Sequence, residues 1–157
     1  MMSVLELKIP PPLVAAAVAG GMYVAASLLP QVLDLELPQG TRLGVALALA
    51  GAGACFDVAG LVAFRKAKTT VNPLTPSKSA AVVTTGVYRL TRNPMYLGLA
   101  LILLGLAVYL ASVWALFGPL VFAAYITRFQ IVPEERVLTA RFGAAFSTYC
   151  ARVRRWL

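Results

Sequence analysis

The sequence predicts an all-α integral membrane protein with four transmembrane helices and an amphipathic C-terminal helix. Three observations favour this fold class. Of the 157 residues, 60% are hydrophobic and 13% are charged, whereas a soluble domain carries about a quarter charged residues. The mean hydropathy is +0.80. Residues 95–127 contain no charged residue, and a run of that length exceeds one straight span of about 30 Å.

The expected spans follow the apolar runs along the chain. The first run ends near Pro30 without a small-residue cleavage site, so we expect a retained span rather than a removed signal. The second contains "LALAGAGA", and small residues suit close helix packing in lipid. The charge-free run is expected to form a hairpin that turns near residues 109–112. The predicted spans are about 13–29, 43–64, 95–110 and 112–131, within a single domain of residues 1–157.

Two polar segments complete the expected architecture. Residues 65–93 form a long basic loop, and loops of this length in small domains are usually functional or disordered. The stretch "PEERVLTARFGAAFSTYCARVRRWL" predicts an amphipathic helix over residues 133–153, with Leu138, Phe142, Ala145 and Tyr149 on one face. A proline and two acids at its start fit the first turn of a helix. The terminal residues Arg152, Arg154, Arg155 and Trp156 are interpreted as an anchor to lipid.

The charge balance indicates partners and orientation. The net charge is +8, with 14 basic and 6 acidic residues. Most basic residues flank apolar runs, which favours membrane lipids over nucleic acid as the partner. The positive-inside rule places the 65–93 loop and both termini in the cytoplasm, in an inner or plasma membrane.

Histidine and cysteine usage excludes several kinds of chemistry. The chain has no histidine, which excludes histidine metal sites and histidine bases. Cys55 and Cys150 lack a metal-ligand spacing, and we interpret both as small buried hydrophobic residues. No metal is expected.

Two polar motifs flank the charge-free run. "TRNPMYLG" precedes it, and Glu134 and Glu135 follow it. Because the two ends of a hairpin are neighbours, we expect Asn93 and Pro94 to lie close to the two glutamates at the cytoplasmic surface.

The order and spacing of these motifs are those of a known family. "GVYRLTRNPMYLG" followed by "PEERVLTARFGAAFSTYCARVRRW" resembles the isoprenylcysteine carboxyl methyltransferases and the related phospholipid methyltransferases. The segment "TTVNPLTPSKSAAVVTTG" resembles a bacterial branch. The resemblance implies S-adenosylmethionine (SAM) as methyl donor and a lipophilic acceptor. The cofactor-binding positions that it implies are Gly86, Val87, Tyr88, Arg92, Asn93, Pro94, Tyr96, Leu97, Gly98, Glu134 and Glu135.

The charges of SAM agree with these residue types. A glutamate suits its ammonium group or a ribose hydroxyl, and an arginine suits its carboxylate. The roles in catalysis are assigned to Arg92, Asn93, Arg128 and Glu135. Relatives often carry histidine where this chain has Asn93, which cannot titrate near neutral pH. Methyl transfer to a carboxylate or thiolate needs alignment more than a base.

Simpler interpretations stand beside these roles. Asn93 with Pro94 also suits an N-cap and first helical position, and the glutamate pair also suits a helix dipole. Asp57 is either functional or paired with Arg65 or the loop. Four further residues are left between two roles. Arg128 and Gln130 are either snorkelling residues or part of the pocket, and Tyr88 and Tyr96 either belong to an interfacial belt or contact the cofactor.

Two other functions remain open from the sequence alone. One is a non-catalytic membrane protein that uses the same fold for assembly or lipid binding. The other is an NADPH-dependent membrane reductase, although the chain lacks a glycine-rich dinucleotide fingerprint. The acceptor atom is left open among oxygen, nitrogen and sulfur.

Overall fold

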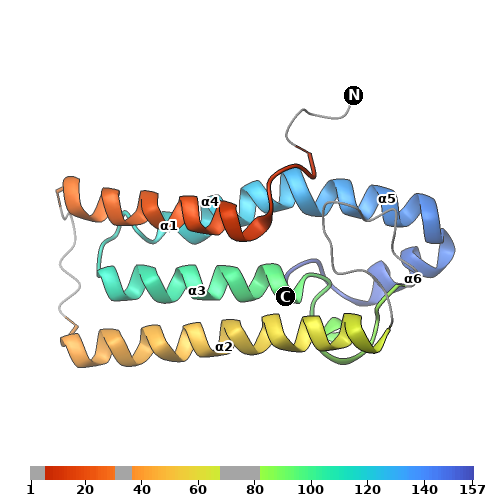
Figure 1. Ribbon diagram of the computed structural model, residues 1–157, viewed down its shortest axis with the longest axis horizontal. Helices are drawn as coiled ribbons and strands as arrows, with labels where there is room; N and C mark the ends of the chain where they lie inside the picture. The colour runs from red at the N-terminus through yellow and green to blue at the C-terminus, as the bar shows by residue number, and fades with distance from the viewer. Residues whose placement is uncertain (1–5, 31–36, 68–81) are drawn as a thin grey trace.

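The computed structural model describes residues 6–30, 37–67 and 82–157, and it confirms the all-α prediction. The elements in chain order are α1 (Pro11–Leu28), α2 (Gln39–Lys66), the 3-10 helix η2 (Gly86–Arg89), α3 (Pro94–Leu110), α4 (Phe117–Ile126), the π-helical turn η3 (Thr127–Ile131), α5 (Val132–Phe142) and α6 (Ala144–Arg152) (Figure 1). Two of them, α1 and α2, are long and apolar enough to cross a membrane, and α3 is a shorter apolar helix.

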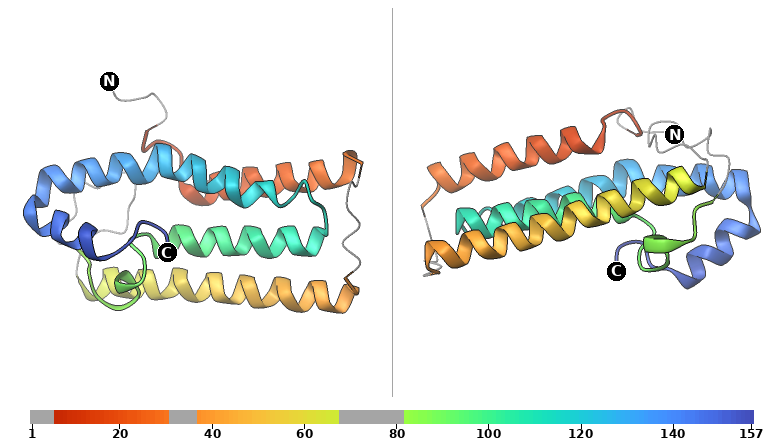
Figure 2. Two further views of the ribbon diagram at one scale, coloured as in Figure 1. Left: turned by 180° about the vertical axis from the view of Figure 1, so that it is seen from behind. Right: turned by 60° about the horizontal axis from the view of Figure 1, so that its bottom comes forward.

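Helix α3 lies at the centre of the bundle. It packs against α1, α2 and α4, and α1 also packs against α4 (Figures 1 and 2). Its outer neighbours expose large apolar side chains, among them Leu13 and Leu28 on α1 and Leu47 and Val58 on α2. Exposed apolar faces of this extent are expected of helices that contact lipid.

Small residues bring α2 and α3 into close contact, as the "LALAGAGA" run predicted. A Cβ added at Gly53 would lie 2.5 Å from the carbonyl oxygen of Gly98, and one added at Gly105 would lie 2.8 Å from that of Ala46. Asp57 lies in the same contact, beside Gly98. Its Oδ1 is buried without a hydrogen-bond partner among the described residues, and no ion pair joins it to Arg65 there. Much of the loop, the other expected partner, lies outside the described residues.

Helices α4 and α5 form one continuous rod, which corrects the predicted boundary between a fourth span and a separate helix at Pro133. The rod passes through the π-helical turn without ending. Pro133 has no N–H to donate to the carbonyl of Phe129 four residues earlier. That carbonyl accepts a hydrogen bond of 3.1 Å from the backbone N–H of Leu7 instead. The N-terminal segment therefore replaces the bond that the proline removes.

The predicted C-terminal helix is broken at Gly143, whereas the amphipathic pattern predicted one helix over residues 133–153. Gly143 has φ 52° and ψ −126°, a combination open to glycine. The chain turns there and α6 folds back towards the bundle (Figure 2). The break changes the buried face, because Phe146 is buried and Ala145 is exposed.

A second cluster of buried residues forms where α6 returns. Phe146 and Tyr149 pack with Ala63 of α2, Tyr88 of η2 and Val83. This cluster holds η2 and α6 beside the end of the bundle at which α3 begins.

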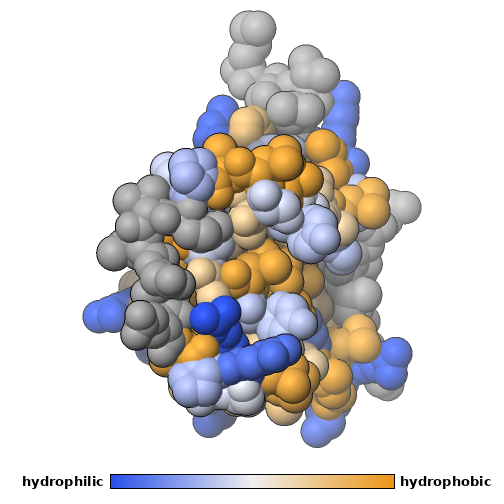
Figure 3. Space-filling view, turned by 90° about the vertical axis from the view of Figure 1, so that its left-hand side faces the viewer, coloured by the Kyte–Doolittle hydropathy of each residue, from blue (hydrophilic) through white to orange (hydrophobic). Residues whose placement is uncertain are grey.

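The opposite end of the bundle carries few charged groups in the described residues. It holds a shallow pocket of 330 Å³ lined by Leu37, Gln39, Arg42 and Tyr109. Figure 3 looks onto this end and shows hydrophilic residues mixed with hydrophobic ones. The charged motifs of the sequence lie at the other end of α3.

Candidate functional site

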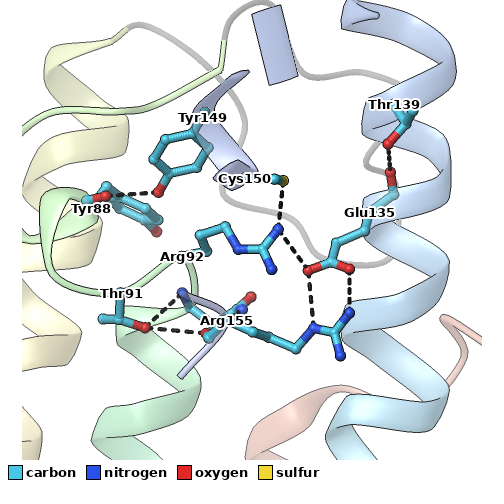
Figure 4. A network of polar contacts seen from close by, with 9 residues as sticks. Tyr88, Thr91, Arg92, Glu135, Thr139, Tyr149, Cys150 and Arg155 are labelled. Carbon is cyan, nitrogen blue, oxygen red and sulfur yellow. Dashed lines mark hydrogen bonds and ion pairs between the residues drawn. The ribbon is translucent and has the colours of Figure 1, made fainter. Parts of the chain in front are cut away.

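The first of the two motifs meets the glutamates across the bundle end, as the sequence predicted. Arg92 precedes α3 and its Nη1 lies 3.2 Å from Oε1 of Glu135, in the first turn of α5. Arg155, in the C-terminal tail, donates to both oxygens of the same carboxylate, from Nε at 3.1 Å and from Nη2 at 2.7 Å (Figure 4). Glu135 is thus held between two arginines, one of them in a two-point contact of the strong charge-assisted kind.

The C-terminal tail is tied to the segment that carries Arg92. The backbone N–H of Arg92 donates to the carbonyl of Arg154 at 3.0 Å. The carbonyl of Arg155 accepts from Asn93 Nδ2 at 2.9 Å and from Thr91 Oγ1 at 3.2 Å. At the other end of the tail, Trp156 Nε1 donates to Thr127 Oγ1 at 3.1 Å. These bonds place Arg155 beside Glu135.

Two expectations are corrected by this arrangement. Arg155 was expected to anchor the tail to lipid, and its guanidinium instead contacts Glu135. Asn93 occupies the N-cap position of α3, but its side chain makes no capping bond and binds the tail. The sequence offered no periodic signal for Arg155, because the tail follows α6 as irregular chain.

Glu134 has a different environment from its neighbour. Its Oε1 accepts a hydrogen bond of 2.6 Å from the hydroxyl of Tyr96 on α3. Burial raises the pKa of Glu134 to about 8, the nearby Glu135 adds to the rise, and the Tyr96 bond opposes it. No ion pair of Glu134 is found in the described part of the chain. We call Arg92, Tyr96, Glu134, Glu135 and Arg155 the inner network.

The guanidinium of Arg92 retains unused hydrogen-bonding capacity. Its side chain is 14% exposed, and its buried Nε has no partner among the residues that the structure describes. Its Nη1 also contacts Sγ of Cys150 on α6 (Figure 4). The interpretation of the cysteines as buried hydrophobic residues is wrong for both, because Cys55 is exposed and Cys150 is a half-buried partner of Arg92.

The tyrosine of η2 is fixed by α6. Tyr149 donates its hydroxyl hydrogen to the carbonyl of Tyr88 at 2.8 Å, and the Tyr88 ring packs edge-on against Phe64 of α2 at 5.4 Å between ring centroids. Burial raises the pKa of Tyr88 and of Tyr149 above its usual value, so both hydroxyls stay neutral. Tyr88 and Tyr96, the two tyrosines for which an interfacial belt was the alternative, are both buried rather than exposed.

The structure does not bring Arg128 into the inner network. Its Nη1 lies 3.0 Å from Oε1 of Glu6, and Nη1 of Arg136 lies 3.4 Å from Oε2 of the same carboxylate. We call these three residues the outer cluster. Two residues of helix separate Glu134 from Arg136, a rotation of roughly 200°, so the outer cluster lies on the other side of the rod.

The remaining predicted positions divide between the bundle end and the helix contacts. Gly86 has φ +62° at the start of η2, a left-handed conformation that glycine adopts without strain. Val87 is half-buried beside it. Pro94 and Leu97 are buried in the first turn of α3. Gly98 faces α2, where Gly53 and Asp57 leave no room for a side chain. Helix packing therefore explains why a glycine occupies this position.

The fold and this site together define a helical protein with two helices apolar enough to cross a membrane and a charged centre at one end of its bundle. The family model for phospholipid methyltransferases matches residues 41–145. The chain belongs to the phospholipid methyltransferase family, which confirms the resemblance seen in its motifs. Membership in this family implies SAM-dependent methylation of lipids.

Comparison with individual proteins adds little to the family match. An uncharacterized protein of Haemophilus influenzae is 43% identical over 63 residues, which make up 40% of this chain and the whole of that protein. No solved structure matches the chain.

Proposed function

We propose that this chain transfers a methyl group from SAM to a lipid-like or amphipathic acceptor at the cytoplasmic face of a membrane. The acceptor group is a carboxylate, a thiol or an amine. The observation that carries the proposal is the meeting of Arg92 with the two glutamates from a distant part of the chain. The resemblance of the two motifs implies that a zwitterionic cofactor binds here, and the arginine and the glutamates offer charges opposite to those of SAM.

The inner network has the unused groups that SAM requires. Arg92 Nε is a buried donor without a partner among the described residues, and it suits a carboxylate. Glu134 is a buried carboxyl group that lacks an ion pair in the same part of the chain, and it suits an ammonium or sulfonium charge. A cation bound beside Glu134 would lower the pKa of this buried carboxyl group and favour its ionised form, which gives the ligand a counter-charge. The site therefore offers a cationic donor for the carboxylate of SAM and an acidic group for its ammonium or sulfonium charge.

Each residue of the network has a distinct task under this proposal. Arg92 binds the cofactor's carboxylate, and Glu135 orients Arg92 through the ion pair. Asn93 fixes the tail that carries Arg155, which in turn holds Glu135. Tyr96 orients the carboxyl group of Glu134. When bound, SAM supplies an electrophilic methyl group on a good leaving group. The main contribution of these residues to the rate is therefore alignment.

Four membrane spans with both termini in the cytoplasm remain part of the proposal. The inner network and most basic residues of the described chain lie at the same end, among them Arg65 and Lys66 at the close of α2 and Arg141 and Arg154 near the C-terminus. The positive-inside rule assigns such an end to the cytoplasm. Membrane lipids are then the proposed partners, and the acceptor enters from the bilayer.

Binding of SAM in detergent tests the proposal. We expect calorimetry to detect binding to the wild-type protein and to show a loss of affinity in Glu134→Ala and Glu135→Ala. Incubation with methyl-labelled SAM and a total membrane lipid extract should then label a lipid, whose structure identifies the acceptor. Absence of binding in the folded wild-type protein, together with unlabelled lipid, would reject the methyltransferase proposal.

A further inference from the structure

Gln130 is a buried polar residue that the inner network does not use. The residue is 1% exposed, and its Nε2 has no hydrogen-bond partner in the part of the chain that the structure describes. The hydroxyl of Tyr125, on the preceding turn of the rod, is also buried without such a partner. The burial of Gln130 is incompatible with snorkelling to a polar surface, which was one of its two interpretations.

The helix geometry places Gln130 below Glu134 on the inner side of the rod. Gln130 lies in the π-helical turn, two residues from the exposed Arg128, and therefore faces roughly the opposite way. It precedes Glu134 by four residues, so the two side chains share a face about one turn apart. Glu134 contacts Tyr96 of α3. Gln130 is therefore directed into the bundle, one turn further from the charged end.

An apolar residue at position 130 would be buried at a lower cost in free energy than glutamine. A buried amide without a partner loses its bonds to water and gains none in the protein, and the surrounding residues Ile126 and Ile131 are apolar and almost completely buried. π-helical turns occur frequently at functional sites. A donor kept unpaired at such a turn is explained if a ligand brings the acceptor.

We propose that Gln130 Nε2 donates a hydrogen bond to a phosphate or ester oxygen of the acceptor lipid, one turn below the group that is methylated. The inference rests on the proposed function. The cofactor's charged groups are accounted for by Arg92 and Glu134, whereas the deeper position is where a lipid that enters from the bilayer has its next oxygen atoms. A neutral amide suits this depth, because a charged donor would cost more to bury.

The test is Gln130→Met, which keeps the size of the side chain and removes the donor. Its matched control is Gln39→Met, at an exposed glutamine of α2. With phosphatidylethanolamine in mixed micelles and saturating SAM, we expect the KM for lipid to rise about tenfold in Gln130→Met, as for one lost hydrogen bond in a dry site. The KM for SAM should stay unchanged, and Gln39→Met should match the wild type. An unchanged KM for lipid, or a rise confined to the KM for SAM, would overturn the inference.

Thermal unfolding in detergent gives a readout that does not depend on turnover. Because Gln130 Nε2 has no described partner, Gln130→Met should unfold at the same or a higher temperature than the wild type without lipid. Added phosphatidylethanolamine should raise the Tm of the wild type and of Gln39→Met more than that of Gln130→Met. A lower Tm of lipid-free Gln130→Met would show a structural role and overturn the inference. If the wild type transfers no methyl group, only the proposed function fails. If phosphatidylethanolamine raises the Tm of all three proteins equally, Gln130 does not bind the lipid and the inference is overturned.

Discussion

Two groups of arginines and carboxylates lie on opposite sides of the α4–α5 rod, and they differ in what they leave unpaired. In the outer cluster, a single buried carboxylate of Glu6 faces two arginines whose side chains are each 55% exposed. In the inner network, Arg92 is 14% exposed and its Nε lacks a described partner, while Glu134 is buried without an ion pair in the described chain. The outer cluster fastens the N-terminal segment. The inner network leaves one donor without a described partner and one acidic group without a described ion pair.

Replacing Glu134 by glutamine should produce the largest change in stability. Burial raises its pKa to about 8 from 4.5, so the folded protein favours the protonated form. Protonated Glu134 makes its full contribution to the free energy of unfolding below about pH 4.5. This contribution, on the order of a few kcal/mol, is lost as the pH rises through about 8. Thermal unfolding in detergent between about pH 5 and about pH 9 should show a falling Tm for the wild type and a flatter profile for Glu134→Gln.

The outer carboxylate provides the contrast for this measurement. Glu6 lies between two arginines rather than beside a second acid. Glu6→Gln should therefore retain the fall in Tm across this alkaline range. Parallel profiles for the wild type and Glu134→Gln would show that Glu134 is ionised in the folded protein at neutral pH.

Arg92→Ala should cause the largest loss of SAM affinity among the arginine variants. It removes the buried donor proposed for the carboxylate, and charge-assisted hydrogen bonds contribute about 2–3 kcal/mol, which corresponds to a Kd roughly 30- to 150-fold higher. Calorimetry in detergent measures the change. Arg136→Ala removes an arginine from the outer cluster and should leave the affinity unchanged.

A second control addresses the nearby chain. Arg89 lies three residues before Arg92 and is exposed, so Arg89→Ala tests whether any loss of positive charge at this end weakens binding. Equal losses for Arg89→Ala and Arg92→Ala would attribute the effect to long-range charge and remove Arg92 from the site.

Composition and periodicity were sufficient to predict which segments are helical, but they were insufficient to predict where the helices end. The charge-free run predicted the α3–α4 hairpin, and the turn falls where Ala111 takes a left-handed conformation with φ 49°. The continuity of α4 with α5 was missed, because a proline usually ends a helix. Here the N–H of Leu7, more than a hundred residues away, satisfies the carbonyl of Phe129 that Pro133 leaves free. A distant contact of this kind leaves no local pattern.

The part of the site formed by the two sequence motifs could be predicted. The part formed by the irregular C-terminal tail could not. The segment that holds Asn93 and Pro94 was expected beside the glutamates because the two ends of a hairpin are neighbours, and its Arg92 does contact Glu135. Arg155 could not be found in this way, since the tail reaches Glu135 through backbone bonds to Arg92 and Asn93 that depend on the turn at Gly143. Arg128 was expected at the site because it is close to the glutamates in sequence, but the rotation of the helix directs it to Glu6.

Glu6→Gln should lower stability by a smaller amount, about 1–2 kcal/mol. The substitution removes the charge from two ion pairs, and the exposed arginines recover part of the loss from water. Because the N–H of Leu7 still bonds to Phe129, the N-terminal segment should stay in place. Thermal unfolding measures the shift, with Lys8→Gln as an exposed neighbour for comparison. A Tm equal to that of the wild type would show that the outer cluster contributes nothing to the fold.

The smallest expected effect concerns Asn93 and separates its two possible roles. The structure shows its amide nitrogen donating to the carbonyl of Arg155 and shows no capping bond to α3. Asn93→Ala should therefore lower the free energy of unfolding by about 0.5–1.5 kcal/mol, the net contribution of one hydrogen bond. Asn93→Asp retains a good capping group but has no donor for the Arg155 carbonyl. We expect it to be as destabilising as alanine, because the carboxylate would face that carbonyl. If Asn93→Asp instead unfolds like the wild type, the side chain acts as a helix cap, and the tail must be held by its other bonds, among them those to Thr91 and to the backbone of Arg92.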